Sequence, residues 1–269
     1  MSGTISTMTT FRLLRQTGRS SRFAQVTVEV AASSRSEVEV TAVAADEHRR
    51  EAELGAQWAL RGLSAARVTV TDVVVTEVDT SVGDVYEATA HAVWRALRVE
   101  HRVPYVGFSD PGMVASWLKS MVGRRLDAVT EARHWYEARR EPDAESLLHA
   151  WLFFDYAMPV GLHRRGEQLL LAKEHPYRSY DMDAYGETKV GPARRPDVLS
   201  GFIGARLTDG AVIVGHDGDA VSAGLVLRFD TGDLVIGTLG DEWVLAVGSV
   251  PAVAAHSWAV QPFVHGGCQ

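Results

Sequence analysis

The hydrophobic pattern of the first hundred residues switches between two periods, and this restricts the folds open to the chain. Residues 22–30, 37–43 and 66–71 alternate apolar and polar side chains, which indicates half-buried β-strands. Residues 46–61 and 81–98 repeat their apolar side chains at helical spacing. The order β-β-α-β-α predicts a two-layer α/β sandwich, in which helices cover one face of a sheet.

The segment 71–81, TDVVVTEVDTS, joins the last of these strands to the second helix and is unusually apolar. Turns favour Gly, Asn, Asp and Pro, so three consecutive valines are unexpected there. The valines either extend the strand or present an apolar patch to a partner. We favour an extended strand that packs on the rest of the protein. Ser81 and Asp84 resemble a capping box with Asp in place of Glu, which predicts the start of the helix.

A short helix is expected at 109–123. Asp110 can cap it, Pro111 suits its first position, and Gly123 suits its end. Its apolar side would consist of Met113, Val114, Trp117, Leu118 and Met121.

The remainder of the chain contains an internal repeat. Three pairs of segments match in the same order: 122–129 with 203–210, 149–155 with 224–230, and 166–172 with 240–246. The matched segments are short alternating runs that end in Gly and Asp, which is typical of β-hairpins and meanders. We expect two small β-rich lobes that could pack face to face; whether they form one lobe or two stays open.

The predicted fold class is therefore α+β, with an N-terminal two-layer α/β sandwich followed by a duplicated β-rich module. Residues 103–107 could add a final short strand to the sandwich. Residues 174–197 are polar and unperiodic, and are expected to form a long connecting loop. The predicted organisation is a domain at 1–108, a connecting helix at 109–123, a first β-rich repeat at 122–173, a loop at 174–197 and a second repeat at 198–269.

Charge and composition limit the possible functions. A hydrophobic content of 46% and a charged content of 23% are ordinary for a globular protein. The formal net charge of −7 disfavours indiscriminate nucleic-acid binding. Residues 1–108 carry 12 basic and 13 acidic side chains, and residues 109–269 carry 15 and 21, so the acidity lies in the second part.

Other features predict the compartment. The only cysteine, Cys268, excludes an intrachain disulfide and a cysteine-based metal site within one chain. The N-terminal sequence lacks the apolar core of a signal peptide, and no run approaches the ~18 apolar residues of a membrane span. We expect a cytoplasmic protein that does not enter a membrane.

Several residues could carry chemistry, but each also has a structural interpretation. His216, Asp217 and Asp219 could form a hydrolase or metal site, although Asp217-Gly218 is a strong turn signal. Asp155 and Asp230 occupy matching places in the two repeats, where an acid pair is conceivable but a turn role is favoured. The ten histidines show no zinc-ligand spacing. Gly201–Ala205 resembles a nucleotide loop only loosely, and we expect no cofactor.

Three stretches of the N-terminal part match motifs of a known family. LRQTGRSSRFAQV at 14–26 is similar to its IRQSGGRGQYGHV, and EHRREAELGAQWAL at 47–60 is similar to its helix EYIPAVQKGIEEAM. A strand followed by DVVVTEVDTS at 72–81 is similar to its strand followed by Asp-Gly-Ser-Tyr-His-x-Val-Asp-Ser-Ser. The N-terminal part thus resembles domain IV of translation elongation factor G, over about 11–100. The resemblance implies the ribosomal protein S5 domain 2-like fold, with a left-handed βαβ crossover.

In that family two loops form a tip that enters the ribosomal decoding centre. The corresponding tip-loop binding surface here would consist of Gly18, Arg19, Arg22, Val74, Val75 and Thr76. The family's Gly-Gly becomes Gly18-Arg19, and its Gly-Ser-Tyr-His becomes Val73–Thr76, so Thr76 replaces the tip histidine. No phosphate-binding Gly-x-x-x-x-Gly-Lys-Ser/Thr occurs, which excludes a GTP-driven translocase.

Basic and aromatic residues accompany the first of these loops. Arg12, Arg15, Arg19 and Arg22 lie near Phe11 and Phe23 in the sequence. Such a cluster can bind RNA, so RNA contact through Arg15, Arg19 and Arg22 is possible. The alternative is a solvated strand edge that its charges protect from aggregation.

The leading functional hypothesis is a non-enzymatic cytoplasmic binding protein without catalytic residues, metal or cofactor, whose partner is a protein or the ribosome. One alternative is an immunity-type or antitoxin-type protein that sequesters a protein partner. A second alternative is a metal-dependent hydrolase that uses His216, Asp217 and Asp219. The identity of the partner and the oligomeric state stay open.

Overall fold

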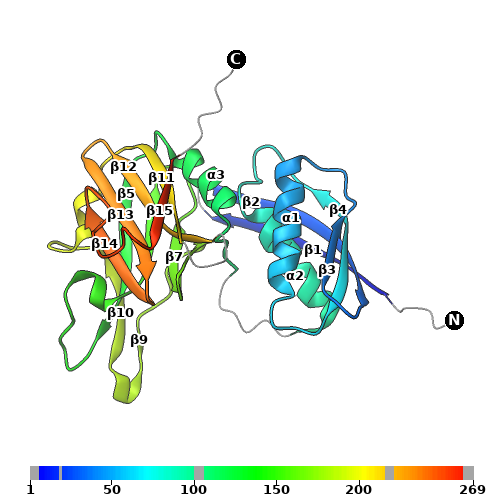
Figure 1. Ribbon diagram of the computed structural model, residues 1–269, viewed down its shortest axis with the longest axis horizontal. Helices are drawn as coiled ribbons and strands as arrows, with labels where there is room; N and C mark the ends of the chain where they lie inside the picture. Colours follow the sequence, from blue (N-terminus) through cyan, green and yellow to red (C-terminus); the bar gives the residue numbers. More distant parts are fainter. Residues whose placement is uncertain (1–5, 18–19, 100–105, 216–220, 263–269) are drawn as a thin grey trace. The chain divides into compact units, whose positions relative to one another are not determined.

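The computed structural model describes residues 6–17, 20–99, 106–215 and 221–262. Within these residues the chain is a mixed α+β protein, mostly β, with three α-helices and fifteen strands in three sheets. It divides into two compact units, Met1–Val106 and Gly107–Gln269 (Figure 1). No helix in the described part of the chain is both long and apolar enough to cross a membrane.

The N-terminal unit contains one four-stranded sheet in the order β1-β2-β4-β3. Its strands are β1 (Ser6–Thr17), β2 (Ser20–Ala32), β3 (Glu37–Val40) and β4 (Ala66–Val74). β1 and β2 form a long antiparallel hairpin, and β4 runs antiparallel to β2 but parallel to β3. Parallel neighbours require a crossover connection, and the helix α1 (Asp46–Ala59) provides it.

Two helices cover one face of this sheet (Figure 1). α2 (Asp84–Leu97) packs on β1 and β2, and α1 packs on α2. The sheet contributes Val26, Val28 and Val30, which alternate along β2 and are buried as the sequence predicts. The two helices approach closely at Gly55, where an added Cβ would lie 2.4 Å from the main-chain oxygen of Tyr86.

The first strand of the unit is absent from the sequence prediction. β1 pairs with β2 over its whole length, from Ser6↔Ala31 to Thr17↔Ser20. Its side chains do not alternate cleanly between apolar and polar, because an edge strand is less buried than its neighbour. The strand expected at 103–107 falls mainly on residues outside the described part of the chain.

Two of the three consecutive valines, Val73 and Val74, extend β4 as favoured from the sequence, and Val75 follows the strand. Val73 pairs with Val26 and is buried, and Val74 pairs with Gln25 at the end of β4. β4 contains a bulge at Thr71. Thr27 pairs with Asp72 and the next residue of β2, Val28, pairs with Val70, so Thr71 has no partner on β2. The chain turns only after these pairs, at 77–79.

Helix α3 (Pro111–Met121) begins and ends as the sequence predicts. The Asp110 side chain accepts a hydrogen bond from the Met113 main-chain N–H at 3.1 Å, and Gly123 follows the helix with a φ of +86°. All five predicted apolar residues of this helix are buried. α3 packs on the strand β11 (Leu207–Gly215), so it belongs to the C-terminal unit instead of linking two domains.

The C-terminal unit contains two antiparallel sheets. The first has the order β8-β7-β6-β5-β10-β9, and the second has the order β14-β13-β12-β11-β15. The first consists of β5 (Leu126–Trp135), β6 (Leu147–Phe154), β7 (Val160–Arg165), β8 (Gln168–Lys173), β9 (Tyr180–Asp181) and β10 (Glu187–Pro192). The second consists of β11, β12 (Ser222–Phe229), β13 (Gly232–Leu239), β14 (Glu242–Val247) and β15 (Trp258–Pro262).

The three pairs of similar segments lie on corresponding strands of these two sheets. The first pair ends in the starts of β5 and β11, and the other two pairs fall on β6 and β12 and on β8 and β14. Each sheet contains a four-stranded meander with a further strand beside its first member, β10 beside β5 and β15 beside β11, and the first sheet has β9 beyond β10 as well. Both sheets belong to one compact unit, so the two lobes expected from the sequence are not separate bodies.

The turns between matched strands use the same contacts. The Arg125 N–H donates to the carboxylate of Asp155 at 2.9 Å, and the Arg206 N–H donates to that of Asp230 at 3.0 Å. The main-chain N–H groups of these two acids donate back to the same arginines. Asp155 and Asp230 therefore secure strand ends, which is the role favoured from the sequence.

The long loop predicted at 174–197 is largely structured, and this prediction is wrong. β9, a 3-10 helix η2 (Asp183–Tyr185) and β10 form a hairpin whose second strand pairs with β5. Two further 3-10 helices, η1 (Asp143–Ser146) and η3 (Val198–Phe202), precede β6 and β11. The segment carries few apolar side chains because β10 has one open face, so its periodicity is weak.

Candidate functional site

The predicted tip-loop surface differs from the structure chiefly at Arg22. This side chain is 1% exposed, and its guanidinium contacts Asp84 at 2.8 Å and Glu87 at 2.5 Å in the first turn of α2. Burial lowers the pKa of Arg22, but the charges of Glu87 and Asp84 outweigh it and raise the pKa overall. The prediction that Arg22 contacts RNA from the surface is therefore wrong: Arg22 points toward the helices, in phase with Val26 and Val28.

Three of the other predicted tip residues, Val74, Val75 and Thr76, lie at one end of the N-terminal sheet. Val74 ends β4 with its side chain partly exposed, Val75 follows it, and Thr76 caps the next turn by accepting a hydrogen bond from the Asp79 N–H. Gly18 and Arg19 lie outside the described residues. Arg15 is about half exposed and contacts Glu87 at 3.4 Å, so of the predicted RNA contacts it is the one described on the surface.

The segment after β4 lies against the start of β2. The Phe23 N–H donates to the Asp79 main-chain oxygen at 2.9 Å, and the Thr80 hydroxyl donates to the Phe23 oxygen at 2.5 Å. Ser21 also donates to the Asp79 carboxylate. These bonds join the segment after β4 to the start of β2. Val78 projects from this junction and is 90% exposed.

The remaining sequence candidates give no catalytic arrangement in the described residues. His216, Asp217 and Asp219 lie outside them. Gly201–Ala205 forms the end of η3 and the approach to β11, not a loop before a helix. Among the described residues no group of three or more His, Cys, Asp and Glu side chains is arranged to hold a metal ion.

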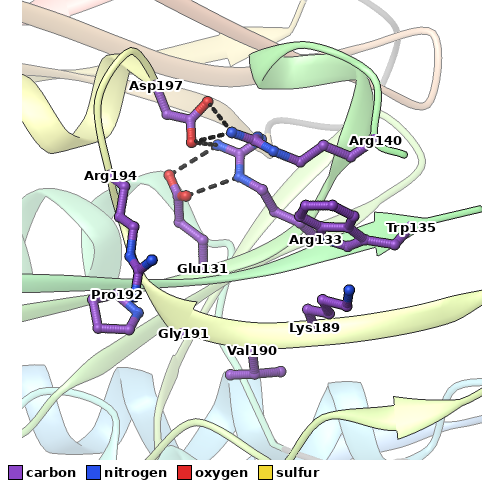
Figure 2. Close-up of a pocket in the computed structure, with 10 residues that line it drawn as sticks. All are labelled: Glu131, Arg133, Trp135, Arg140, Lys189, Val190, Gly191, Pro192, Arg194 and Asp197. Atoms are coloured by element: carbon purple, nitrogen blue, oxygen red, sulfur yellow. Dashed lines mark hydrogen bonds and ion pairs between the residues drawn. The ribbon is translucent and has the colours of Figure 1, made fainter. Parts of the chain in front are cut away.

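A pocket of about 250 Å³ in the C-terminal unit brings several charged side chains together, and we call it the cationic pocket. β5 and β10 form its floor, and the segments before η1 and η3 form its walls (Figure 2). Its charged lining residues are Glu131, Arg133, Arg140, Lys189, Arg194 and Asp197, and its other lining residues are Trp135, Val190, Gly191 and Pro192.

A buried ion network forms the back of the cationic pocket. Arg133 donates to both carboxylate oxygens of Glu131, at 2.8 and 2.9 Å, and contacts Asp197 at 3.7 Å. It also donates to Ser146 and to the main-chain oxygen of Asp143. Arg140 approaches from the other side and donates to both oxygens of Asp197, at 3.0 and 2.8 Å (Figure 2).

Burial changes the titration of this network. Removal from water raises the pKa of Glu131, and the adjacent Arg133 only partly offsets the rise. Burial alone would lower the pKa of Arg133, but Glu131, Asp197 and Asp143 reverse this and raise it. Arg133 therefore stays charged, and its donors are used by protein groups. Its role is to hold the pocket wall together.

Three other cations surround the open space. Lys189 lies over the Trp135 ring, with Nζ 4.1 Å from the ring centroid, and pairs with Glu187 at 2.9 Å. The Arg194 side chain forms no ion pair or hydrogen bond with any described residue and is exposed. Arg140 Nη1 is shielded from solvent and has no hydrogen-bond partner. A shielded donor of this kind is costly unless a further group satisfies it.

Gly191 leaves the floor of the pocket open. It pairs with Glu131 across β5 and β10, so a side chain at this position would share a face with Glu131. A Cβ added there meets no atom within 4 Å. The glycine thus adds room beside the cations, and a large side chain at 191 would enter the pocket without disturbing the sheet.

The opposite face of the first sheet carries an aromatic cluster. The Tyr177 hydroxyl and His149 Nδ1 are hydrogen-bonded at 2.7 Å. Glu174 accepts from Trp151 Nε1 at 3.1 Å and lies 2.7 Å from His163 Nε2. Burial, with smaller contributions from the charges of His163 and Arg164, lowers the pKa of His149 to about 3. These contacts fasten the segment after β8, which leads into the β9–β10 hairpin.

Comparison with known proteins adds no assignment. The sequence matches no model of a known protein family, and no curated protein matches it.

Sequence reasoning missed the cationic pocket for identifiable reasons. Arg194 and Asp197 lie in the segment predicted to be a connecting loop, and Arg140 lies between two elements. One signal was present: Glu131 and Arg133 are charged residues two apart on a strand of the repeated module. Residues with that spacing lie on the same face of the sheet, so this pattern predicts an ion pair between the two side chains.

Proposed function

We propose that the chain is a binding protein whose C-terminal unit receives an anionic group in the cationic pocket. The observation that supports this most is the grouping of Arg140, Lys189 and Arg194 around one open space in an otherwise acidic unit. Positive charges around a concave site focus the electrostatic field and raise the local concentration of anions. Arg133, Glu131 and Asp197 hold the wall rigid, which lowers the entropic cost of binding.

Titration of the full-length protein with small anions tests this proposal. Isothermal titration at pH 7.5 in low salt, with phosphate, sulfate and benzoate in turn, should show binding to one site that weakens as salt rises. Gly191→Leu fills the pocket and should abolish that binding. Gly201→Leu is the matched control, because a Cβ at Gly201 also meets nothing within 4 Å and lies outside the pocket lining. Equal binding by both variants would exclude the pocket.

We also propose that the N-terminal unit is an S5 domain 2-like domain, similar to domain IV of elongation factor G, and that the two C-terminal sheets are copies of one duplicated module. The element order β-β-β-α-β-α, the parallel β3–β4 pair and the junction of the two loops at Phe23 and Asp79 support the first part. The matched strand order and the turn contacts of Asp155 and Asp230 support the second.

On this reading the N-terminal unit binds the ribosome or a translation component through the loop junction, without GTPase activity. Exposed Val78 and Arg15 at this end support a contact surface. Co-sedimentation of the protein with ribosomes at low salt is the expected result, and Val78→Asp should weaken it. Absence of the protein from the ribosomal pellet would contradict this part while leaving the pocket proposal intact.

The alternative function is sequestration of a protein partner, as immunity or antitoxin proteins do. The acidic net charge and the exposed tyrosines Tyr180 and Tyr185 on the β9–β10 hairpin favour it, since tyrosine is enriched in interfaces. A stoichiometric protein partner that resists high salt in a pull-down is expected in this case. The hydrolase alternative rests on His216, Asp217 and Asp219 and would require metal in the purified protein.

A further inference from the structure

The cations of the cationic pocket approach its open space from different sides. Arg194 extends from the segment after β10, Lys189 stands on β10, and Arg140 comes from the segment after β5 (Figure 2). A carboxylate has two oxygens in a plane, whereas a phosphate monoester has three terminal oxygens directed to different sides. Arginine and lysine are the usual partners of such oxygens.

We propose that the anionic group bound in this pocket is the dianionic phosphate of a small phosphate monoester. This inference rests on the proposed function of the C-terminal unit and specifies its ligand. The six charged lining residues, four basic and two acidic, leave two positive charges in excess. A phosphate monoester carries about −1.5 to −2 charges at pH 7. A carboxylate, a sulfate monoester and an internal phosphodiester each carry only one.

Two acids that do not line the pocket reduce its positive electrostatic potential. Asp143 contacts Arg133 at 3.4 Å, and Glu187 contacts Lys189 at 2.9 Å. Glu187 is about half exposed, so solvent screens it. Removal of its charge should strengthen the binding of a dianion through Lys189. Glu187→Gln is therefore expected to bind the phosphate ester more tightly, by about twofold to fivefold.

The walls beside the cations suit the organic part of an ester. The Trp135 ring lies on the same face of the sheet as Gly191, whereas the Val190 and Pro192 side chains point to the other face, so β10 borders the pocket there with its main chain. A monoester with a small apolar or aromatic substituent can place its phosphate among the cations and its substituent against Trp135 and the flat main chain at Gly191. A pocket of about 250 Å³ is smaller than the ~300–1,000 Å³ typical of sites that enclose drug-sized ligands, so a small ester fits better.

The ionisation of the ligand provides a specific signature. The second pKa of a phosphate monoester is about 6, so below pH 6 the ligand loses one charge, whereas a sulfate ester keeps its single charge. Glu131 and Asp197 also face the pocket, from β5 and the segment before η3, beside Arg133, Arg140, Lys189 and Arg194. Protonation of either acid would strengthen binding of both esters, so the ratio of their affinities isolates the ionisation of the phosphate.

Isothermal titration of the full-length protein with four matched probes tests the proposal. The probes are phenyl phosphate, phenyl sulfate, benzoate and methyl phenyl phosphate. At pH 7.5 phenyl phosphate should bind at least tenfold more tightly than each monoanion, and it should exceed inorganic phosphate. Its advantage over phenyl sulfate should fall severalfold at pH 5. Gly191→Leu should abolish binding and Gly201→Leu should not.

A single charge change tests the role of Arg194. Arg194→Gln removes an exposed cation that has no described protein partner, so folding should be unaffected. It should weaken phenyl phosphate by about tenfold and phenyl sulfate by less. If the monoanions bind within twofold of phenyl phosphate, the pocket accepts anions in general and only this inference fails. If no probe binds, or Gly191→Leu binds normally, the proposed function fails as well.

Discussion

At the scale of single residues, the position of Arg22 shows how the pleat of a strand decides the role of a charge. Along β2 every second side chain points to the helices, and Arg22 has the same phase as Val26, Val28 and Val30. The chain places Asp84 and Glu87 opposite it in the first turn of α2, where acids also suit the helix dipole. A residue that resembles a surface arginine in a linear motif is thus an anchor for α2.

Arg22→Met should destabilise the N-terminal unit strongly. It removes the buried cation that Asp84 and Glu87 share, and the loss of one partner of a buried ion pair typically costs about 3–5 kcal/mol. Denaturant unfolding followed by circular dichroism measures the change. Arg35→Met is the matched control, because Arg35 forms its ion pair with Glu37 on the surface and should have little effect. An equal loss in both variants would contradict the assignment.

His149 should make stability depend on pH. Its pKa is about 3 in the folded protein and about 6.5 in the unfolded chain, so only the unfolded state takes up a proton between these values. The contribution is fully present above pH 6.5 and is lost progressively as the pH falls toward 3, by up to about 1.4 kcal/mol per pH unit. His149→Gln should flatten this part of the stability profile, whereas His256→Gln, an exposed control, should leave it unchanged.

At the scale of elements, the hairpin between β5 and η1 adopts a turn that its sequence disfavours. The main chains of Tyr136 and Arg139 exchange two hydrogen bonds, at 2.8 and 2.9 Å. The two residues between them, Glu137 and Ala138, have φ values of 48° and 60°. A type I′ turn requires positive φ at both central positions, where Asn-Gly is preferred. This unfavourable turn lies between Trp135 and Arg140, two residues that line the cationic pocket.

Replacement of Glu137-Ala138 by Asn-Gly should stabilise the C-terminal unit by about 1 kcal/mol, because a left-handed conformation costs roughly 1–2 kcal/mol for an ordinary L-residue. Urea unfolding of the double variant against the parent protein gives the value. Glu141→Asn, just beyond the hairpin and without a positive φ, should give no gain. Destabilisation of the double variant would show that the present residues make contacts that outweigh the strain.

At the scale of the whole molecule, the division into two units separates the two proposed functions. All ten residues that line the cationic pocket lie in the unit Gly107–Gln269, and the loop junction lies in Met1–Val106. Each unit has its own buried core, the first around Val26 and Val28 and the second around residues such as Trp151 and Ile213. Units with separate cores can fold independently.

A fragment of residues 107–269 should therefore bind phenyl phosphate with an affinity within about twofold of the full-length protein. A fragment of residues 1–106 should show no such binding. Calorimetry of both fragments, with circular dichroism to verify that each is folded, makes the comparison. Loss of binding in a folded 107–269 fragment would mean that the N-terminal unit contributes to the site.

Local sequence determined the elements whose signals are contained in a few neighbouring residues. The alternation of β2, the capped helix α3 and the matched segments of the two sheets could all be predicted, because periodicity, Asp110 before Pro111 and repeated turns act over short distances. β1 and β10 could not be predicted, since each is only half covered and depends on a neighbouring strand for its hydrogen bonds.

Only the tertiary structure decided which charges meet. Arg22 pairs with Asp84 and Glu87, which lie more than sixty residues further along the chain, and Arg140 pairs with Asp197, which lies fifty-seven residues further. Such pairs leave no periodic signal, because the sequence does not distinguish a charged residue that faces water from one that faces a buried partner. The sequence alone thus determined the strands and helices that carry these residues, and the packing of distant segments determined that they form an anchor in one unit and a pocket in the other.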